Sequence, residues 1–143
     1  MEVRRCTDPT DVYALVDLVK KELPEEHLDY EQYAQMLIGA SNDPNVLMLG
    51  VFSDGTCIGG LIAVGPAVPY RHARIIQAVG PLAMGTTSKV YHEVVERWAK
   101  ARGAEALVME TTRNVAAIKK KYGYEKTATL MTKELSDGRP SEA

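Results

Sequence analysis

A predicted strand is broken by a glycine and a proline shortly before the most regular helix of the chain. The strand runs from about Ala73 to Leu82, and Gly80-Pro81 interrupts it. Proline cannot donate a ladder hydrogen bond, so we expect a bulge or an unpaired edge at this point. Backbone N–H and C=O groups that lack a partner strand can pair with an extended ligand instead. The break therefore favours a sheet that is open at this place.

A long amphipathic helix follows the break and leads into another strand. Its apolar residues recur at spacings of three and four, as expected for one buried helix face. They are Val90, Tyr91, Val94, Val95, Trp98 and Ala99. Gly103 ends the helix, and Ala104 to Glu110 is typical of a buried strand. Strand, loop, helix and strand in this order predict a βαβ unit.

The first half of the chain predicts a short strand, two helices and a hairpin. The strand covers Val3 to Thr7, and Asp8-Pro9 provides an N-cap and a first-turn proline for a helix that Pro24 ends. The second helix starts at Asp29 and ends at Gly39. The hairpin is predicted from two apolar runs joined by a tight turn, Val46 to Phe52 and Cys57 to Val64.

After the βαβ unit we expect one more helix, from about Arg113 to Tyr122, and a last strand from Tyr124 to Leu135. The complete order is β-α-α-β-β-β-α-β-α-β. This order predicts an α+β fold with a mixed sheet and helices on both faces. We expect a single domain over residues 1–135 and a flexible polar tail over 136–143.

Composition and charge exclude several classes of protein. The 143 residues carry a formal charge of -2, which argues against a dedicated nucleic-acid binder. The longest uncharged run, Ile75 to Ser88, is too short and too broken to span a membrane, and the N-terminus has no secretory signal, so we predict a cytoplasmic protein. Cys6 and Cys57 are interpreted as buried small hydrophobic residues, and no metal site is predicted.

Small and hydroxyl-bearing residues lie between the break and the helix. Gly85 allows close backbone approach, while Thr86, Thr87 and Ser88 add hydroxyl donors beside a helix N-terminus, where phosphate binds readily. An amide arm along the broken strand and a pyrophosphate at the helix start would together fit coenzyme A. The same residues also suit an ordinary N-cap loop, so both interpretations stay open.

In the order and spacing of these elements, the chain resembles the GNAT superfamily of acetyl-CoA-dependent N-acyltransferases. The resemblance is sharpest from Val79 to Leu135. It is carried by Glu96-Arg97-Trp98-Ala99-Lys100-Ala101-Arg102-Gly103, Ala106-Leu107-Val108-Met109-Glu110, Asn114-Val115-Ala116-Ala117-Ile118, Tyr122-Gly123-Tyr124-Glu125 and Met131-Thr132-Lys133-Glu134-Leu135. It implies a GNAT fold, acetyl-CoA as co-substrate and transfer of an acetyl group to an amine. The chain is similar to small divergent members such as GNAT-like proteins of phages.

The resemblance implies a set of coenzyme-binding residues around the start of the long helix. They are Leu82, Ala83, Met84, Gly85, Thr86, Thr87, Ser88 and Lys89, together with Asn114 and Ala117. In this loop the family pattern has Arg or Gln, two residues, Gly, one residue, and Gly or Ala. Here Ala83, Thr86 and Ser88 stand at the three defining positions. These departures keep open an alternative function, a non-catalytic GNAT-like binding or assembly protein.

Two residues of this chain are candidates for the acid–base chemistry of such a transfer. Transfer needs a base or water chain that takes a proton from the amine, and a donor for the leaving thiolate. Family members often carry a Glu on the strand before the loop, where this chain offers only Gln77. We therefore interpret Glu110, at the end of its strand, as the candidate base. Tyr122 is the candidate donor, because Lys119 replaces the usual Tyr. The alternatives are a solvated strand end and a packed tyrosine.

Two basic clusters have open roles. Lys119-Lys120-Lys121 with Lys126 would meet the 3′-phosphate of coenzyme A or a nucleic acid, or would form a solvated face. Arg71, His72 and Arg74 would suit an acidic acceptor. The sequence names no acceptor amine, and both a monomer and a homodimer fit a last strand at the sheet edge.

Overall fold

A computed structural model describes residues 2–80, 85–109, 123–125 and 131–135, with residues 85–91 described as helical backbone. The chain divides into two compact units, Met1–Met109 and Glu110–Ala143. Everything described below about sheet, helices and site concerns the first unit unless the second is named. The single domain expected over residues 1–135 stays a prediction.

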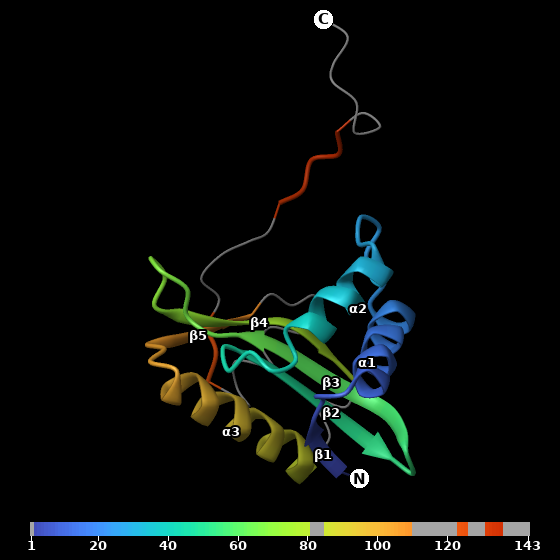
Figure 1. Ribbon diagram of the computed structural model, residues 1–143. Helices are drawn as coiled ribbons and strands as arrows, with labels where there is room; N and C mark the ends of the chain where they lie inside the picture. Colours follow the sequence, from blue (N-terminus) through green and yellow to red (C-terminus); the bar gives the residue numbers. More distant parts are fainter. Residues whose placement is uncertain (1, 81–84, 110–122, 126–130, 136–143) are drawn as a thin grey trace, which may run out of the picture. The chain divides into compact units, whose positions relative to one another are not determined.

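The first unit is a five-stranded mixed sheet with helices on both faces (Figure 1). Its elements are β1 (Glu2–Arg5), α1 (Pro9–Glu22), α2 (Tyr30–Gly39), β2 (Val46–Ser53), β3 (Thr56–Val64), β4 (His72–Val79), α3 (Gly85–Ala101) and β5 (Ala106–Met109). The strands lie in sequence order. The first four pair antiparallel, whereas β4 and β5 are parallel across α3. The predicted α+β order and its βαβ unit are confirmed over these eight elements.

Side-chain caps fix where α1 and α2 begin. The Asp8 carboxylate accepts a hydrogen bond from the Asp11 backbone N–H at 3.0 Å, and Asp29 accepts one from Gln32 N–H at 3.1 Å. Pro9 occupies the first turn of α1, where its missing N–H costs nothing. Both caps were predicted from the sequence, because an acidic residue before an apolar repeat is a local signal.

We expect Asp8→Ala to lower the free energy of unfolding by about 1 kcal/mol, the usual cost of losing an N-cap. Asp17→Ala is the matched control, because Asp17 carries the same charge on the exposed face of the same helix. Urea unfolding of both variants measures the difference. Equal midpoints for Asp8→Ala and Asp17→Ala would contradict a stabilising role for the cap.

Each face of the sheet carries its own apolar core. On one face, α1 and α2 pack against Met48, Phe52, Ile62 and Val79. On the other, Val95 of α3 packs against a second cluster of alternate strand residues, Leu47, Leu49, Val51, Leu61, Ala63 and Ile75. Burial raises the pKa of the Cys6 thiol to about 12, and Cys6 is buried as predicted. Cys57 is half-buried.

One predicted boundary is wrong. The long helix begins at Gly85, whereas the sequence favoured a loop as far as Ser88. Hydroxyl residues can occupy a first helical turn as well as a cap, so their presence did not fix the boundary. Strand β4 ends at Val79, directly before the predicted interruption, because the chain turns at Gly80 with a positive φ of 90°. Residues 81 and 82 of the predicted strand lie outside the described residues.

In the second unit, the strand predicted over Tyr124 to Leu135 is not seen at its described residues, 124–125 and 131–135. Met131 and Leu135 are exposed, so the alternation in this segment does not bury an apolar face there. The helix predicted over Arg113 to Tyr122 lies outside the described residues.

Candidate functional site

Strands β4 and β5 are parallel neighbours at one edge of the described sheet. Their pairing extends from His72 and Ala106 to Ile75 and Met109 within the described residues. Strand β4 continues to Val79 and stays paired with β3 along this stretch. The β5-facing edge of residues 76–79 therefore has no described partner strand. Residues 110–122, which follow β5, lie outside the described residues, so the predicted failure of pairing stays a prediction.

Gly80 ends β4 in a conformation that only glycine adopts easily. Its φ is +90°, and a Cβ at this position would overlap the Ile58 carbonyl oxygen and the Gly59 Cα atom. Both obstacles are backbone atoms of the neighbouring strand, so they cannot rotate away. The close approach of these two glycine-containing segments fixes the direction in which the chain leaves the sheet.

The N-terminus of α3 follows after four residues that lie outside the description, 81–84. Because the helix begins at Gly85, its first turn comprises Gly85, Thr86, Thr87 and Ser88, and Lys89 follows. The first four N–H groups of a helix have no intrahelical acceptor, and they favour an anion. Leu82, Ala83 and Met84 of the predicted set lie outside the described residues.

A β-bulge decides which way the side chains of residues 77–79 of β4 point. Ile62 pairs with Gln77 and Ala63 pairs with Ile75, so Ile76 is the extra residue. Beyond the bulge the alternation is inverted. Ala78 packs on the α3 face together with Ile75, while Val79 packs on the α1 and α2 face. Gln77 is therefore directed towards α1 and α2.

Gln77 meets side chains from α2 and from the α1–α2 connection. Its Nε2 atom lies 3.5 Å from the Glu25 carboxylate, the outer limit of a hydrogen bond, and its amide also bonds the Tyr33 hydroxyl. Burial raises the pKa of Tyr33 well above its usual value, the negative charge of Glu25 raises it further, and the Gln77 hydrogen bond lowers it. Sequence reasoning noted Gln77 only as a missing carboxylate and did not single out Glu25 or Tyr33.

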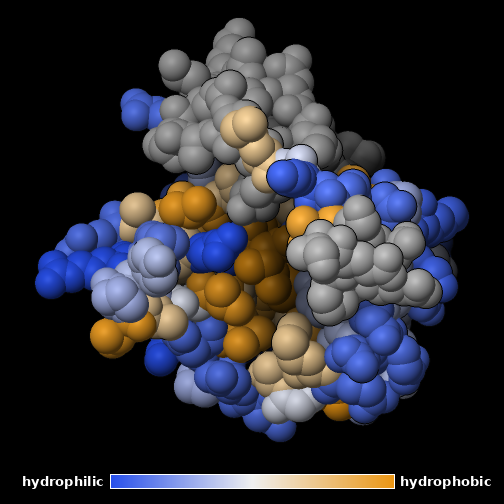
Figure 2. Space-filling view, turned by 90° about the horizontal axis from the view of Figure 1, so that it is seen from above, coloured by the Kyte–Doolittle hydropathy of each residue, from blue (hydrophilic) through white to orange (hydrophobic). Residues whose placement is uncertain are grey.

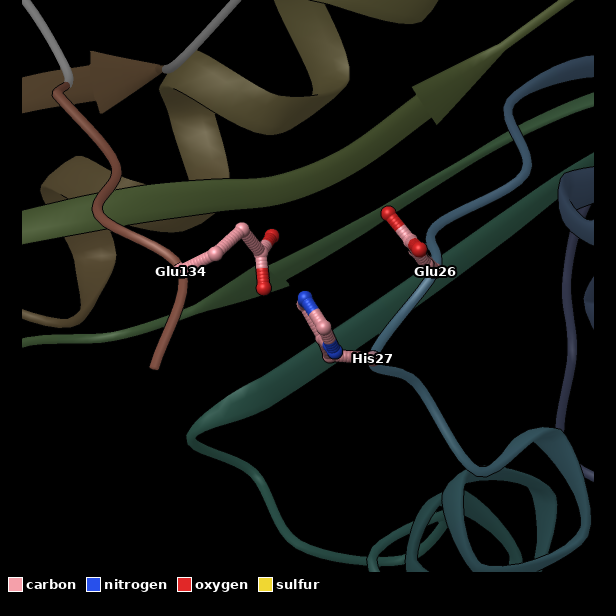
Figure 3. A group of neighbouring side chains, drawn as sticks. All are labelled: Glu26, His27 and Glu134. Carbon is pink, nitrogen blue, oxygen red and sulfur yellow. The ribbon is translucent and has the colours of Figure 1, made fainter. Parts of the chain in front are cut away.

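The α1–α2 connection is held above the sheet by α2. The Glu25 backbone N–H donates to the Tyr30 hydroxyl at 2.7 Å, and the Lys20 ammonium lies over the Tyr30 ring. Figure 3 shows Glu26 and His27 on this connection; Glu134, also labelled there, belongs to the second unit. Seen from the α1 and α2 side, apolar side chains gather in a hollow bordered by polar ones (Figure 2).

Several predicted site residues are not placed. Glu110 and Tyr122, the candidate base and donor, lie outside the described residues, as do Asn114, Ala117 and the lysine cluster. In the other basic cluster, Arg71 pairs with Glu105 at 3.3 Å and the rings of Tyr70 and His72 are in contact. Arg71 therefore forms an ion pair with the residue directly before β5. Its role in binding an acidic acceptor stays a prediction.

No protein-family model matches the chain, and no curated protein matches it. Solved structures do match. An aminoglycoside 6′-N-acetyltransferase of Acinetobacter haemolyticus is 14% identical, with 95% of this chain and 99% of that chain covered at a TM-score of 0.68. The aminoglycoside acetyltransferase AAC(6′)-Iy in complex with CoA is 15% identical, with 94% and 93% covered at 0.67. The fold is that of the GNAT acetyltransferases.

A third GNAT structure, glucosamine-6-phosphate N-acetyltransferase of Arabidopsis thaliana, is 12% identical, with 94% of this chain and 98% of that chain covered at a TM-score of 0.72. The GNAT resemblance inferred from the sequence is thus confirmed at the level of the fold. Among the helices that the structure describes, none is both long enough and apolar enough to cross a membrane.

Proposed function

We propose that the protein is an acetyl-CoA-dependent N-acetyltransferase. The observation that carries the proposal is the β5-facing edge of residues 76–79, which has no described partner strand and is followed in the sequence by the start of α3 at Gly85. An extended amide ligand can pair with such an edge, and a pyrophosphate suits a helix N-terminus. Coenzyme A carries both groups. The GNAT fold and the CoA complex of a similar structure support the same conclusion.

In this proposal the acetyl group passes directly from the thioester to an amine, with no covalent enzyme intermediate. Backbone N–H groups of the β4 edge polarise the thioester carbonyl, and alignment of the two reactants supplies much of the rate. Residues 82–89, Asn114 and Ala117 are proposed to hold the coenzyme. Glu110 and Tyr122 stay predicted as acid–base residues, and the protein is proposed to act in the cytoplasm as a monomer or homodimer.

The acceptor is proposed to be an amine. Two amines serve as probes. Sisomicin is bound in another similar structure, an aminoglycoside acetyltransferase from a soil metagenomic sample. Glucosamine 6-phosphate appears in the name of the Arabidopsis thaliana enzyme. They differ in charge, because sisomicin is a polycation and glucosamine 6-phosphate carries a phosphate. Comparing the rates of their acetylation therefore also reports which charge the acceptor site favours.

The coenzyme site is tested by calorimetric titration with acetyl-CoA. We expect micromolar binding by the wild-type protein and at least a tenfold loss in Gly85→Trp, because an indole at the start of α3 would fill the space that a pyrophosphate needs. Lys100→Trp is the matched control, since it places the same side chain on the exposed last turn of the same helix. Thermal unfolding of both variants shows whether they fold.

Absence of binding by the wild-type protein at millimolar acetyl-CoA would overturn the proposal. The alternative function, a GNAT-like binding or assembly protein without coenzyme chemistry, would then be favoured. Equal affinity of the wild-type protein and Gly85→Trp for acetyl-CoA would show that the coenzyme does not bind at the N-terminus of α3.

A further inference from the structure

An amine that attacks a thioester must first lose a proton, and the side chains of residues 76–79 of β4 include no group that can take it. The side chain that the bulge directs towards α1 and α2 is Gln77, whose amide is not basic at neutral pH. An amide can, however, donate hydrogen bonds that hold a carboxylate in place. The side chains that Gln77 contacts therefore decide where a base is available.

The carboxylate that reaches Gln77 is Glu25, in the connection between α1 and α2. The Gln77 Nε2 atom lies 3.5 Å from Glu25 Oε1. Tyr33, which is only 8% exposed, bonds the same amide and limits how Gln77 can turn. The Glu25 backbone is tied to the Tyr30 hydroxyl at 2.7 Å. Three side chains on α2 and β4 thus hold an exposed carboxylate beside residue 77 of β4.

Neighbouring carboxylates are already engaged in structural contacts. Asp29 accepts a hydrogen bond from Gln32 as the N-cap of α2, and Glu31 accepts bonds from Tyr13 and Gln35. Asp11, in the first turn of α1, pairs with Arg4 at 3.1 Å. Glu25 differs from these in that its contact is with β4, the strand along which the thioester is proposed to lie.

We propose that Glu25 is the base that takes the proton from the acceptor amine, and that Gln77 is the residue that positions it; this rests on the proposed acetyltransferase activity. The protonated amine gives one proton to the Glu25 carboxylate. Its nitrogen then bonds to the thioester carbonyl carbon while the carbon–sulfur bond breaks. The second amine proton passes to the CoA thiolate, so the products are the N-acetyl amine, CoA thiol and protonated Glu25, which releases its proton to water.

The test measures acetylation of sisomicin and glucosamine 6-phosphate by mass spectrometry, with acetyl-CoA as donor. We expect Glu25→Gln to lower kcat/KM about 100-fold, within the usual range for losing a general base, while its affinity for acetyl-CoA stays unchanged. Glu26→Gln is the matched control, because Glu26 is the adjacent exposed carboxylate of the same connection. It should keep wild-type activity.

A second variant separates a base from a structural residue. The double variant Glu25→Gln with Gln77→Glu exchanges the carboxylate and the amide across their 3.5 Å contact, so that the carboxylate lies on β4. Its kcat/KM should be at least tenfold higher than that of Glu25→Gln.

Wild-type activity in Glu25→Gln would overturn the assignment and leave the proposed function standing. Failure of the double variant Glu25→Gln with Gln77→Glu to recover activity would also overturn it. Wild-type protein that binds acetyl-CoA but acetylates neither amine would overturn the assignment of Glu25 to this reaction. Failure to bind acetyl-CoA is the separate result that refutes the proposed function itself.

Discussion

Replacing Leu15 with alanine should lower the free energy of unfolding by about 3–5 kcal/mol, the range measured for fully buried leucines. Leu15 is 1% exposed and projects from α1 onto the sheet. Its Cδ1 atom occupies the space that a Cβ on Gly60 of β3 would need. Because Gly60 has no side chain to move into the void, the cavity cannot close locally and the cost should be near the top of the range.

Urea unfolding of Leu15→Ala measures this cost, and Leu18→Ala on the same helix is the control. Leu18 is only partly buried, so its truncation removes less apolar contact and should cost about 1–2 kcal/mol. A loss from Leu15→Ala no larger than that from Leu18→Ala would contradict the central place of Leu15 in this core.

A double-mutant cycle tests the fit between α1 and β3 directly. Gly60→Ala alone should be destabilising, because its Cβ would overlap the Leu15 side chain. In the Leu15→Ala background the same methyl group partly fills the cavity. We therefore expect the double variant to be more stable than the sum of the single effects by about 0.5–2 kcal/mol. Simple additivity would show that the two residues do not share this space.

The helices and strands of the first half were predictable because their signals are local. Asp8 and Asp29 cap helices within three residues, and the runs that form β2 and β3 have strand length with a turn between them. The parallel β4–α3–β5 unit was equally predictable from the sequence, since a strand, a long amphipathic helix and a buried strand in this order are compatible with few other topologies.

The candidate site was less predictable because it depends on one extra residue in one strand. In Ile75-Ile76-Gln77-Ala78, an uninterrupted alternation would place Gln77 on the face of Ile75, whereas the bulge places it on the opposite face. Nothing in the four residues reveals a bulge, which arises from the pairing with β3. The contact with Glu25 joins residues 52 positions apart, and Glu25 lies in a connection without periodicity.

The sharpest constraint at the site is the turn at Gly80, and Gly80→Ala should lower the free energy of unfolding by about 2–4 kcal/mol. Two costs contribute. The positive φ of 90° disfavours any side chain, and the new Cβ would overlap backbone atoms of Ile58 and Gly59. The strand must shift to relieve the overlap, so acetyl-CoA affinity should fall as well, even under conditions where the variant is folded.

Two variants separate these costs from a general effect of replacing glycine. Gly39→Ala lies at the end of α2 with no atom near its Cβ, and should be neutral or stabilising by about 0.5–1 kcal/mol because alanine favours helix. In Gly80→Asn, the asparagine tolerates a positive φ better than alanine does, but it has the same Cβ atom. If the overlap with β3 dominates, Gly80→Asn is as unstable as Gly80→Ala; if it is clearly more stable, the backbone conformation is the larger cost. A stable Gly80→Ala with wild-type affinity would show that the exit from β4 does not shape the coenzyme site.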